Sequence, residues 1–317
     1  MTIVQPGSEI IRRKSTLYRV SDCRDEMFRQ YHEGKEKGST THIEDIDKCW
    51  KWRNKEFNLW TGYMNEGKSE LLRNLAVIKA IVDGWKFLFS APEDFPPAEF
   101  FDSMIHTIAG TSTDKDSPYQ VPEDFYLRAM AILEEHIFFV YMEPGSTIAE
   151  TLAEFKRYMK EEIGPVNAAI IDPLIKFARP KDLSDRDDIY AQHITTLCTD
   201  FCRKENLSLN LVMHQLTPRM LENGYYPKPS AYFIKGGGTW ADGVDNILYV
   251  WRPTYAKDKL DPTVEFGSQK IKKQKLVGVP QSIQMRFDRK SNRYTDPVTG
   301  RDMFNFDEVI HKIMSKK

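Results

Sequence analysis

The stretch GYMNEGKS, residues 62–69, decides the fold class of this 317-residue chain. It follows the apolar run FNLWT (57–61) and precedes the helical pattern ELLRNLAVIKAI (70–81), so a strand, a loop and a helix are expected in that order. Glycines in the loop let backbone N–H groups wrap around an anion, and the start of the helix adds a partial positive charge. The stretch therefore predicts a Walker A loop, which binds the phosphates of a nucleotide.

The residue types in this loop match the chemistry of a nucleoside triphosphate with Mg²⁺. Lys68 is expected to reach the β and γ phosphate oxygens, and the hydroxyl of Ser69 is expected to ligate the metal. The expected cofactors are therefore ATP and Mg²⁺. The residues predicted to contact the nucleotide are Gly62, Asn65, Glu66, Gly67, Lys68, Ser69 and Glu70.

Carboxylates at two further places fit the same site. Asp172 ends the apolar run NAAIID (167–172), where a strand-end carboxylate can hold Mg²⁺ through water, as a Walker B acid does. Hydrolysis also needs a group that polarises the attacking water. The phrase SAPEDFP (90–96) places Glu93 and Asp94 at the end of the next expected strand. Spacing alone does not decide between these two acids.

Short apolar runs alternate with longer helical patterns from residue 57 onward. The runs are FNLWT, KFLFSA, HIFFVY, NAAIID, LNLVM and NILYVW. Such alternation predicts an α/β fold with a mostly parallel sheet and helices on both faces. Near the carboxyl end, Ile283, Met285 and Phe287 alternate with polar residues before the turn-like RKSN (289–292), which predicts a β-hairpin. A final helix is expected over 305–315.

A separate pattern precedes this core. Apolar residues recur at helical spacing among charged ones, at Leu17, Val20, Met27, Phe28 and Tyr31. They predict an amphipathic helix over 17–33, and the polar stretch GKEKGSTTH (34–42) indicates a linker after it. We expect an amino-terminal arm with this linker helix at 1–37 and an ATPase core at 38–317. The pattern leaves open whether the helix packs on its own core or on a neighbouring copy.

Composition limits the classes of protein to which the chain can belong. With 41% hydrophobic and 29% charged residues it is typical of a globular protein, and no apolar run approaches the roughly 20 residues that span a membrane. The amino terminus lacks the apolar segment of a secretory signal, and the four cysteines show no disulfide or zinc pattern, so a cytoplasmic protein is expected. The net charge of −1 gives no global basic field, so nucleic-acid binding would depend on local clusters of Lys and Arg.

Five motifs in a fixed order resemble a known family. The order GYMNEGKS, FSAPED, AAIIDPL, VMHQLTPR and IKGGGTWADGVDNILYVWR is similar to that of the motor domain of DnaB/Twinkle-like replicative hexameric DNA helicases, over residues 38–296. The resemblance implies a RecA-like P-loop NTPase core in which Lys68 and Ser69 bind nucleotide and Mg²⁺ and Asp172 is the Walker B acid. The family's catalytic glutamate ends the second core strand, in a phrase similar to FSAPED, which favours Glu93.

The resemblance also implies how the nucleotide site and a DNA site are coupled. Gln215, in the phrase HQLTPR, matches the polar sensor between the γ-phosphate and the DNA loop, and its neighbour His214 could share that task. The segment Thr217–Gly238 resembles the DNA loop of the central channel, where cations and backbone amides contact phosphates without reading bases. Its expected DNA-binding residues are Arg219, Lys228, Lys235, Gly236, Gly237 and Gly238.

The last motif departs from the family. Members carry a basic pair followed by glycines, and an arginine of this motif reaches the ATP site of the neighbouring subunit. The phrase here is KQKLVGVP (273–280), with Lys275 at the finger position and Pro280 where glycine is usual. Lysine lacks the planar fork of arginine, so it is a weaker clamp for a transition state. Either Lys275 serves less efficiently, or Arg286 or Arg289 takes the role, or hydrolysis is slow.

By resemblance, the chain is expected to be a magnesium-dependent, ATP-hydrolysing DNA helicase of DNA replication. Copies would form a hexameric ring on single-stranded DNA, and a primase or a polymerase is a further expected partner. With about 55 residues before the core, it would be a motor-only protein of a phage or mobile element, in the host cytoplasm, or a fragment of a longer product. One alternative is a RecA/RadA-like recombinase, which would show a polymerisation strand and two mobile DNA loops, whereas the sequence indicates one loop. The other is a P-loop ATPase without motor activity.

Overall fold

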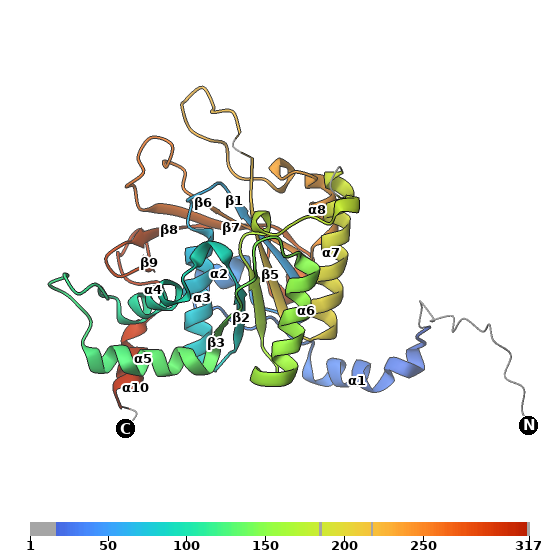
Figure 1. Cartoon of the computed structure of the whole chain (residues 1–317). Coiled ribbons are helices and arrows are strands. Elements are labelled where there is room, and N and C mark those ends of the chain that lie inside the picture. Colours follow the sequence, from blue (N-terminus) through green and yellow to red (C-terminus); the bar gives the residue numbers. More distant parts are fainter. Residues whose placement is uncertain (1–16, 184–185, 217, 316–317) are drawn as a thin grey trace, which may run out of the picture. The chain divides into compact units, whose positions relative to one another are not determined.

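A single twisted sheet organises the core, seen in a computed structural model that describes residues 17–183, 186–216 and 218–315 (Figure 1). In the described residues its strand order is β3-β2-β4-β5-β1-β6-β7-β8-β9. The first six strands in this order are parallel, and β7, β8 and β9 are antiparallel to their neighbours. The strand bounds are β1 (Phe57–Gly62), β2 (Phe87–Ser90), β3 (Ile137–Phe139), β4 (Ala168–Ile171), β5 (Ser208–His214), β6 (Asn246–Trp251), β7 (Thr263–Ile271), β8 (Ser282–Asp288) and β9 (Arg293–Thr295).

Helices cover both faces of the sheet, and each face has its own apolar core. Alternate residues of one strand enter opposite cores: Phe87 and Phe89 of β2 pack on one side, and Leu88 between them packs on the other. The first core contains residues of α2 (Glu44–Cys49), α3 (Lys68–Asp83), α4 (Pro97–Ala109), α5 (Glu123–His136) and α10 (Phe306–Ser315). The second contains residues of α6 (Ile148–Tyr158), α7 (Asp187–Lys204) and α8 (Gly237–Gly243).

This architecture confirms the α/β fold with a mostly parallel sheet that the alternating pattern predicted. Each of the six apolar runs forms a strand, because each alternates between the two cores or is buried throughout. Strands β8 and β9 form the expected antiparallel hairpin, and the final helix covers 306–315. No helix in the described ranges is long and apolar enough to cross a membrane.

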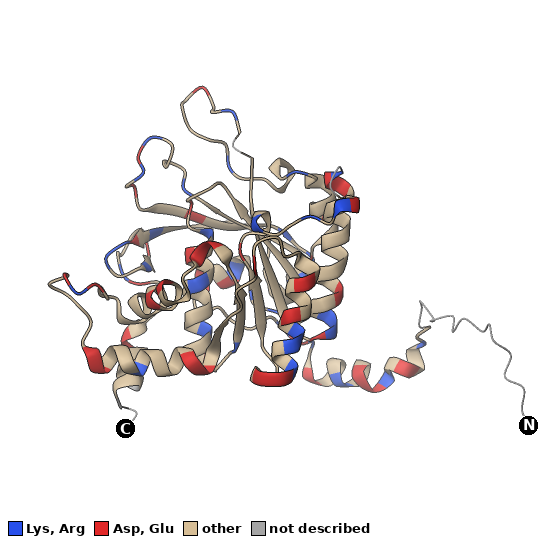
Figure 2. Ribbon diagram, in the orientation of Figure 1, with Lys and Arg blue, Asp and Glu red and all other residues tan. Residues whose placement is uncertain are grey.

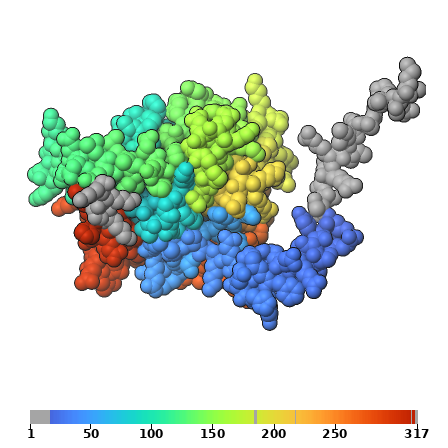
Figure 3. Space-filling view, turned by 90° about the horizontal axis from the view of Figure 1, so that it is seen from below, coloured from blue at the N-terminus to red at the C-terminus, as the bar shows by residue number. Residues whose placement is uncertain are grey.

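The segment that enters the core lies along the edge where the parallel strands begin. The amide of Gly38 donates to the Leu276 carbonyl, and that of Lys55 donates to the Leu207 carbonyl. Figure 3 views this edge, on which the light-blue segment after residue 38 lies beside the orange and red carboxyl-terminal part of the chain. These contacts join the segment to residues that are distant in sequence. The segment therefore closes the side of the sheet where the parallel strands begin.

The arm forms a unit of its own, residues 1–37, separate from 38–317. In its described part, a short 3₁₀ turn, η1 (Val20–Cys23), leads into α1 (Arg24–Glu33), so the expected helix exists but starts at residue 20. It starts there because the Asp22 carboxylate accepts from the Arg19 amide at 2.7 Å and caps the first turn. Residues of η1 and α1 bury no side chain within the arm, and Met27, Phe28 and Tyr31 are exposed.

A buried asparagine on each of three neighbouring strands fixes the register of the sheet. Asn58 of β1 lies opposite Asn210 of β5 and Asn246 of β6. Asn58 Nδ2 donates to Asn210 Oδ1 at 3.2 Å, and its Oδ1 accepts from Asn246 Nδ2 at 2.8 Å and from Trp50 Nε1 at 3.2 Å. A shift of one residue would break all three bonds inside the core, so this register is strongly favoured.

We predict that Asn58→Ala lowers the free energy of unfolding by about 2–4 kcal/mol, because it leaves the buried Trp50 Nε1 without its acceptor and removes one of the two acceptors of Asn246 Nδ2. Urea denaturation measures the change. Asn223→Ala, at an exposed loop position, is the control and should change stability by no more than about 0.5 kcal/mol. Equal stability of the two variants would show that the asparagine ladder does not hold the register.

Candidate nucleotide site

The predicted phosphate loop joins the end of β1 to the start of α3 at the centre of the sheet. Gly62 has φ +145°, and a Cβ there would lie 2.3 Å from the Val250 carbonyl oxygen of the neighbouring strand. Gly67, just before α3, has φ +87°. Side chains are therefore excluded at both positions, which leaves the backbone amides between them and the start of α3 able to face a ligand.

Lys68 carries a positive charge into the interior of this loop. Its side chain is 3% exposed, and Nζ donates to the carbonyl oxygen of Tyr63 at 2.6 Å. Burial lowers the pKa of Lys68 to about 8, and the negative charges of Asp172, Glu66 and Glu93 oppose that change. No carboxylate of the described residues forms an ion pair with the Lys68 ammonium, whose acceptor is the neutral Tyr63 carbonyl. A phosphate oxygen could therefore replace this carbonyl as its acceptor.

Asp172 lies directly after β4, next to the phosphate loop. Its amide donates to the Ser90 carbonyl at 2.9 Å, which fixes the backbone beside β2. Burial raises the pKa of Asp172 to about 6, while a hydrogen bond from Ser69 and the charges of Arg73 and Lys68 lower it. The structure thus brings Ser69 and Asp172 together, although they are far apart in the sequence.

The oxygens of Ser69 and Asp172 fit Mg²⁺ bound together with a nucleotide. No group of three His, Cys, Asp or Glu side chains in the described ranges is arranged to hold a metal ion alone. Magnesium bound by one or two side chains, its own waters and substrate phosphates does not need such a group. The donor set therefore suits a metal that arrives with a triphosphate.

Two buried polar atoms near the loop lack partners within the part of the chain that the structure describes. They are Ser90 Oγ, at the end of β2, and His214 Nδ1, at the end of β5. Burial lowers the pKa of His214 to about 4; Lys68 and Lys176 lower it further, while Glu93 opposes them. Unpaired buried polar atoms at the carboxyl ends of parallel strands indicate a place for water or a polar ligand.

Glu66 completes the inner wall of the loop. Its carboxylate accepts from the Tyr63 amide at 3.3 Å and is 1% exposed. Burial raises its pKa to about 7, and the charge of Lys68 and hydrogen bonds from Tyr63 and Arg252 oppose that change. Glu66 therefore supports the loop from inside.

Glu93 and Asp94 have different partners. Asp94 pairs with Arg73 at 2.8 Å, with the two side chains 25% and 16% exposed, and Arg73 also pairs with Glu70 at 3.0 Å. Glu93 pairs with Lys176 at 3.0 Å, with side chains 44% and 47% exposed. An ion pair becomes costlier to break as it is more buried, and exposed pairs contribute only about 0–1 kcal/mol. Glu93 is thus the acid that can change its partner at low cost.

Glu70 belongs to the framework around the site. Its carboxylate accepts from Asn292 Nδ2 at 2.9 Å, in the turn between β8 and β9, in addition to pairing with Arg73. Tyr294 of β9 donates to the Gly67 carbonyl at 3.4 Å. The carboxyl-terminal hairpin therefore holds the phosphate loop and the first turn of α3.

Gln215 connects the strand of the phosphate loop with the expected DNA loop. Its Nε2 donates to Thr61 Oγ1 at 3.0 Å, one residue before the loop begins. Its Oε1 accepts from the amide of Ser230 at 3.2 Å. Movement at the end of β1 can therefore reach residue 230 through a single buried side chain.

The expected DNA loop rises above the carboxyl edge of the sheet and carries basic residues, as does the loop at 252–262 (Figure 2). Arg219 and Lys235 are exposed, and no acidic side chain within the described ranges pairs with Lys235. Lys228 instead pairs with the buried Glu265 of β7 at 2.5 Å. Its charge is therefore already compensated within the chain. Thr217 lies outside the described residues.

The glycines at 236–238 have two different roles in the backbone. A Cβ on Gly236 would lie 2.8 Å from the Asp187 carbonyl oxygen, and one on Gly237 would lie 2.7 Å from the Tyr232 Cα. Close packing therefore requires glycine at both positions. A Cβ on Gly238 would meet no atom within 4 Å, and this residue is exposed at the start of α8.

Lys275 lies away from the nucleotide site of its own chain. Strand β7 is antiparallel to β6 and ends at Ile271, opposite Asn246, so α9 (Gln274–Val277) lies at the edge where the parallel strands begin. The phosphate loop lies at the other edge. Lys272 pairs with Asp245 and Lys273 with Glu56, while Lys275 is exposed.

The two arginines that could replace Lys275 as the finger, Arg286 and Arg289, lie at the end of β8, toward the edge that carries the phosphate loop. Arg286 is exposed on β8, close to the hairpin that contacts the phosphate loop. Arg289 donates to the Lys259 carbonyl at 2.7 Å.

Several residues that contact the predicted site residues, or the carboxylates around them, could not be identified from the sequence. They include Arg73, Lys176, Glu265, Asn292 and Tyr294. Only Arg73 has a local signal, since it stands three residues after Glu70 on a predicted helix and so shares its face.

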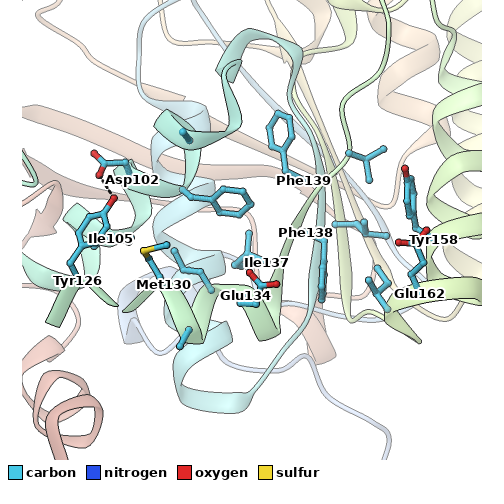
Figure 4. A pocket seen from close by; sticks show the side chains of 17 residues that line it. Asp102, Ile105, Tyr126, Met130, Glu134, Ile137, Phe138, Phe139, Tyr158 and Glu162 are labelled. Carbon is cyan, nitrogen blue, oxygen red and sulfur yellow. Dashed lines mark hydrogen bonds between the residues drawn. The ribbon is translucent and has the colours of Figure 1, made fainter. Parts of the chain in front are cut away.

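The pocket in Figure 4, about 700 Å³ in volume, lies elsewhere, at the sheet edge formed by β3. Side chains of α4, α5 and β3 line it, among them Asp102, Tyr126 and Phe139. It contains none of the residues predicted from the sequence to bind nucleotide, metal or DNA.

The low pKa of His214 predicts a pH dependence of stability. Because its folded pKa of about 4 lies below the ordinary 6.5, the unfolded chain binds more protons between these values, and stability falls as the pH drops from 6.5 to 4. We expect this fall in stability between pH 6.5 and 4 to be smaller by about 1–3 kcal/mol in His214→Gln. Thermal melts of both proteins at pH 7.5, 5.5 and 4.5 measure it. A difference in Tm that stays constant across this range would contradict a buried neutral imidazole.

Comparison with known proteins agrees with the fold. No family model matches the sequence. A segment of 81 residues, 24% of the chain, is 35% identical to RuvB-like helicase 2 of Encephalitozoon cuniculi, and the match spans about a fifth, 19%, of that protein.

Two solved structures are similar over most of the chain. One is described as an ATPase domain, with a TM-score of 0.71 and 13% identity over 87% of this chain and 98% of that domain. The other is a DnaB-like replicative helicase, described with its interactions with primase, with a TM-score of 0.68 and 13% identity over 88% of this chain and 67% of that chain. Over most of its length the chain therefore shares the RecA-like fold of these two structures, as the order of its motifs implied.

Proposed function

We propose that this protein is an ATP-dependent DNA helicase that translocates on single-stranded DNA as a hexameric ring. One observation carries the proposal: the hydroxyl of Ser69 hydrogen-bonds the carboxylate of Asp172, and the buried ammonium of Lys68 interacts electrostatically with that carboxylate, at the carboxyl edge of a RecA-like sheet. This edge is where ligands bind in open α/β sheets. The similarity to a solved ATPase domain and to a DnaB-like replicative helicase supports a motor on this fold.

In the proposed reaction each side chain has one task. Lys68 leaves the Tyr63 carbonyl and binds the β and γ phosphate oxygens, while Ser69 and Asp172 hold the metal and its waters. When bound, Mg²⁺ neutralises charge that develops on the phosphate oxygens. Glu93 orients and polarises the attacking water, for which its exposed, replaceable ion pair suits it better than the partly buried pair with Arg73 suits Asp94.

Gln215 is proposed to transmit the state of the nucleotide to the DNA loop. It is bonded at one end to Thr61, beside the phosphate loop, and at the other to Ser230, six residues before Gly236. Gln269 of β7 accepts from the Ala231 amide at 3.0 Å and also donates to the Pro229 carbonyl, so the DNA loop is anchored at 229–231. Exposed Arg219 and Lys235 would then contact DNA phosphates, with the backbone of Gly238.

Assembly of copies would complete each ATP site. Lys275 lies at the edge opposite its own phosphate loop, so it could act only on the nucleotide of another copy, as the finger of a neighbouring subunit does in a ring. The exposed apolar side chains of α1 are proposed to dock on a second copy and tether the ring. A primase or a polymerase is the further partner that this role would require.

A RecA/RadA-like recombinase is the second candidate, because the structure adds a second loop beside the first. Lys257, in the loop 252–262 between β6 and β7, lies over the ring of Tyr225 at 3.8 Å. A recombinase uses two DNA loops, and the sequence indicated only one. Imaging with ATP and single-stranded DNA separates the candidates, since closed rings support the helicase and helical filaments support the recombinase.

We predict that Lys68→Ala abolishes ATP hydrolysis and helicase activity, because it removes the cation that binds the β and γ phosphates. Its melting temperature without nucleotide should stay at or above that of the natural protein, since Lys68 is a buried charge with a lowered pKa. ATP at 100 times its Kd should stabilise the natural protein by about 2.7 kcal/mol and the variant by far less. Full ATPase activity in the variant would refute the site.

We also predict that Lys235→Ala weakens binding to single-stranded DNA and lowers the slope of log K against log salt by about 1, because a free cation at a phosphate is lost. Lys228→Ala should lower the slope less, since Glu265 already compensates that charge. Lys160→Ala, an exposed lysine outside the loop, is the control. Fluorescence anisotropy at several salt concentrations measures all three, and an unchanged slope for Lys235→Ala would exclude this lysine from the DNA site.

A further inference from the structure

Lys176 has no task in the proposed reaction, yet it occupies a position at the site. It is the last residue of η4 (Leu174–Lys176), the short turn that follows Asp172 and Pro173, so its backbone is fixed to the end of β4. Its Nζ pairs with Glu93 Oε1, and its charge reaches His214 at the end of β5. A cation therefore lies among the side chains that surround the expected γ-phosphate.

We propose that Lys176 is a positioning residue that restrains Glu93, so that the carboxylate must leave this ion pair before it can orient the attacking water. The inference rests on the proposed function, in which Glu93 is the acid that polarises water. It adds that the fraction of copies with Glu93 released from Lys176 sets the basal rate of hydrolysis.

The backbone around Glu93 is held by a turn in which the Asp94 amide donates to the Ala91 carbonyl at 2.9 Å. Asp94 is anchored to the partly buried Arg73. On the same segment, the rings of Phe95 and Tyr141 pack with centroids 4.9 Å apart. With η2 (Pro92–Asp94) fixed, the Glu93 side chain can exchange one partner for another by rotation about its own bonds.

A cavity beside Lys176 leaves the lysine side chain room to move away from Glu93. A cavity of about 290 Å³ is lined by Pro92, Phe95, Tyr141, Lys176 and Phe177, with Glu143 at its border. Because Lys176 shares this cavity with the carboxylate of Glu143, released Lys176 has an alternative acid nearby.

The exposure of the pair limits the size of the effect. Because both side chains are nearly half exposed, the pair holds Glu93 only weakly, in the range of exposed ion pairs. Such a restraint changes a population by about two- to fivefold and not by orders of magnitude. Lys176 would therefore tune the basal rate and would not switch it off.

The test is the steady-state ATPase of Lys176→Met, which keeps the length of the side chain and removes its charge. We expect kcat to rise about two- to fivefold while KM for ATP stays unchanged. Lys176→Arg keeps the ion pair and should behave as the natural protein. The control is Lys156→Met, which breaks the surface ion pair between Lys156 of α6 and Glu205 after α7, at 2.8 Å. This variant should leave kcat unchanged.

The dependence of kcat on salt concentration gives a second measurement, and its result would not change if Lys176 had only a structural role. Screening loosens exposed ion pairs, since the Debye length falls from about 10 Å at 0.1 M to about 3 Å at 1 M. The ratio of kcat between Lys176→Met and the natural protein should therefore approach one as KCl is raised. A kcat in Lys176→Met that equals or falls below that of the natural protein at low salt would overturn the restraint.

Glu93→Gln separates failure of this inference from failure of the proposed function. If the natural protein hydrolyses ATP and both Lys68→Ala and Glu93→Gln abolish hydrolysis, the proposed function stands, and Lys176→Met alone decides the restraint. The double variant Glu93→Gln with Lys176→Met should be as inactive as Glu93→Gln. Faster hydrolysis in the double variant would show that Lys176 does not act through Glu93, which would overturn the inference.

Discussion

The buried charge of Lys68 is the constraint on which the rest of the site depends. An ammonium that is almost fully removed from water is costly unless anions surround it. In this chain those anions are Asp172 and Glu66, and the parallel sheet brings them together because the carboxyl ends of β1 and β4 meet at one edge with β5 between them. Burial lowers the pKa of Lys68 and raises the pKa of Asp172, so it favours the uncharged form of each side chain. A triphosphate with Mg²⁺ would restore both charges, so the electrostatics of the loop favour that ligand.

The framework around the loop is built so that this edge stays fixed. The asparagine ladder across β5, β1 and β6 sets the register from inside the sheet, and close contact between Gly62 and the Val250 carbonyl sets the start of the loop. The hairpin β8–β9 holds the loop from outside through Tyr294 and Asn292. Against this fixed background, Glu93 is joined to Lys176 by an exposed ion pair, and the side chain of Gln215 alone links Thr61 to Ser230. These are the contacts that the proposed motor would change.

Much of the fold could be predicted because its signals are local. The stretch 62–69 carries its own strand, loop and helix, and the apolar runs alternate with helical patterns over most of the core. The start of the helix in the arm was placed three residues early, because capping by Asp22 begins the helical turn at Val20 and hydrophobic spacing does not show that. Partners across the fold could not be predicted. Nothing near Lys228 in the sequence shows that Glu265 compensates its charge, and nothing near Glu93 shows that Lys176 binds it. The assignments of Glu93, Gln215, Lys275 and the DNA loop stay predictions.

The central claim is that residues 62–69 bind a triphosphate whose metal is shared with Asp172. The most direct measurement is an experimental structure with a non-hydrolysable ATP analogue and Mg²⁺. We predict β and γ phosphates against the amides of the loop, Lys68 Nζ moved from the Tyr63 carbonyl to a phosphate oxygen, and a metal between Ser69 and Asp172. An empty loop at saturating analogue, with Lys68 still bonded to Tyr63, would contradict the account.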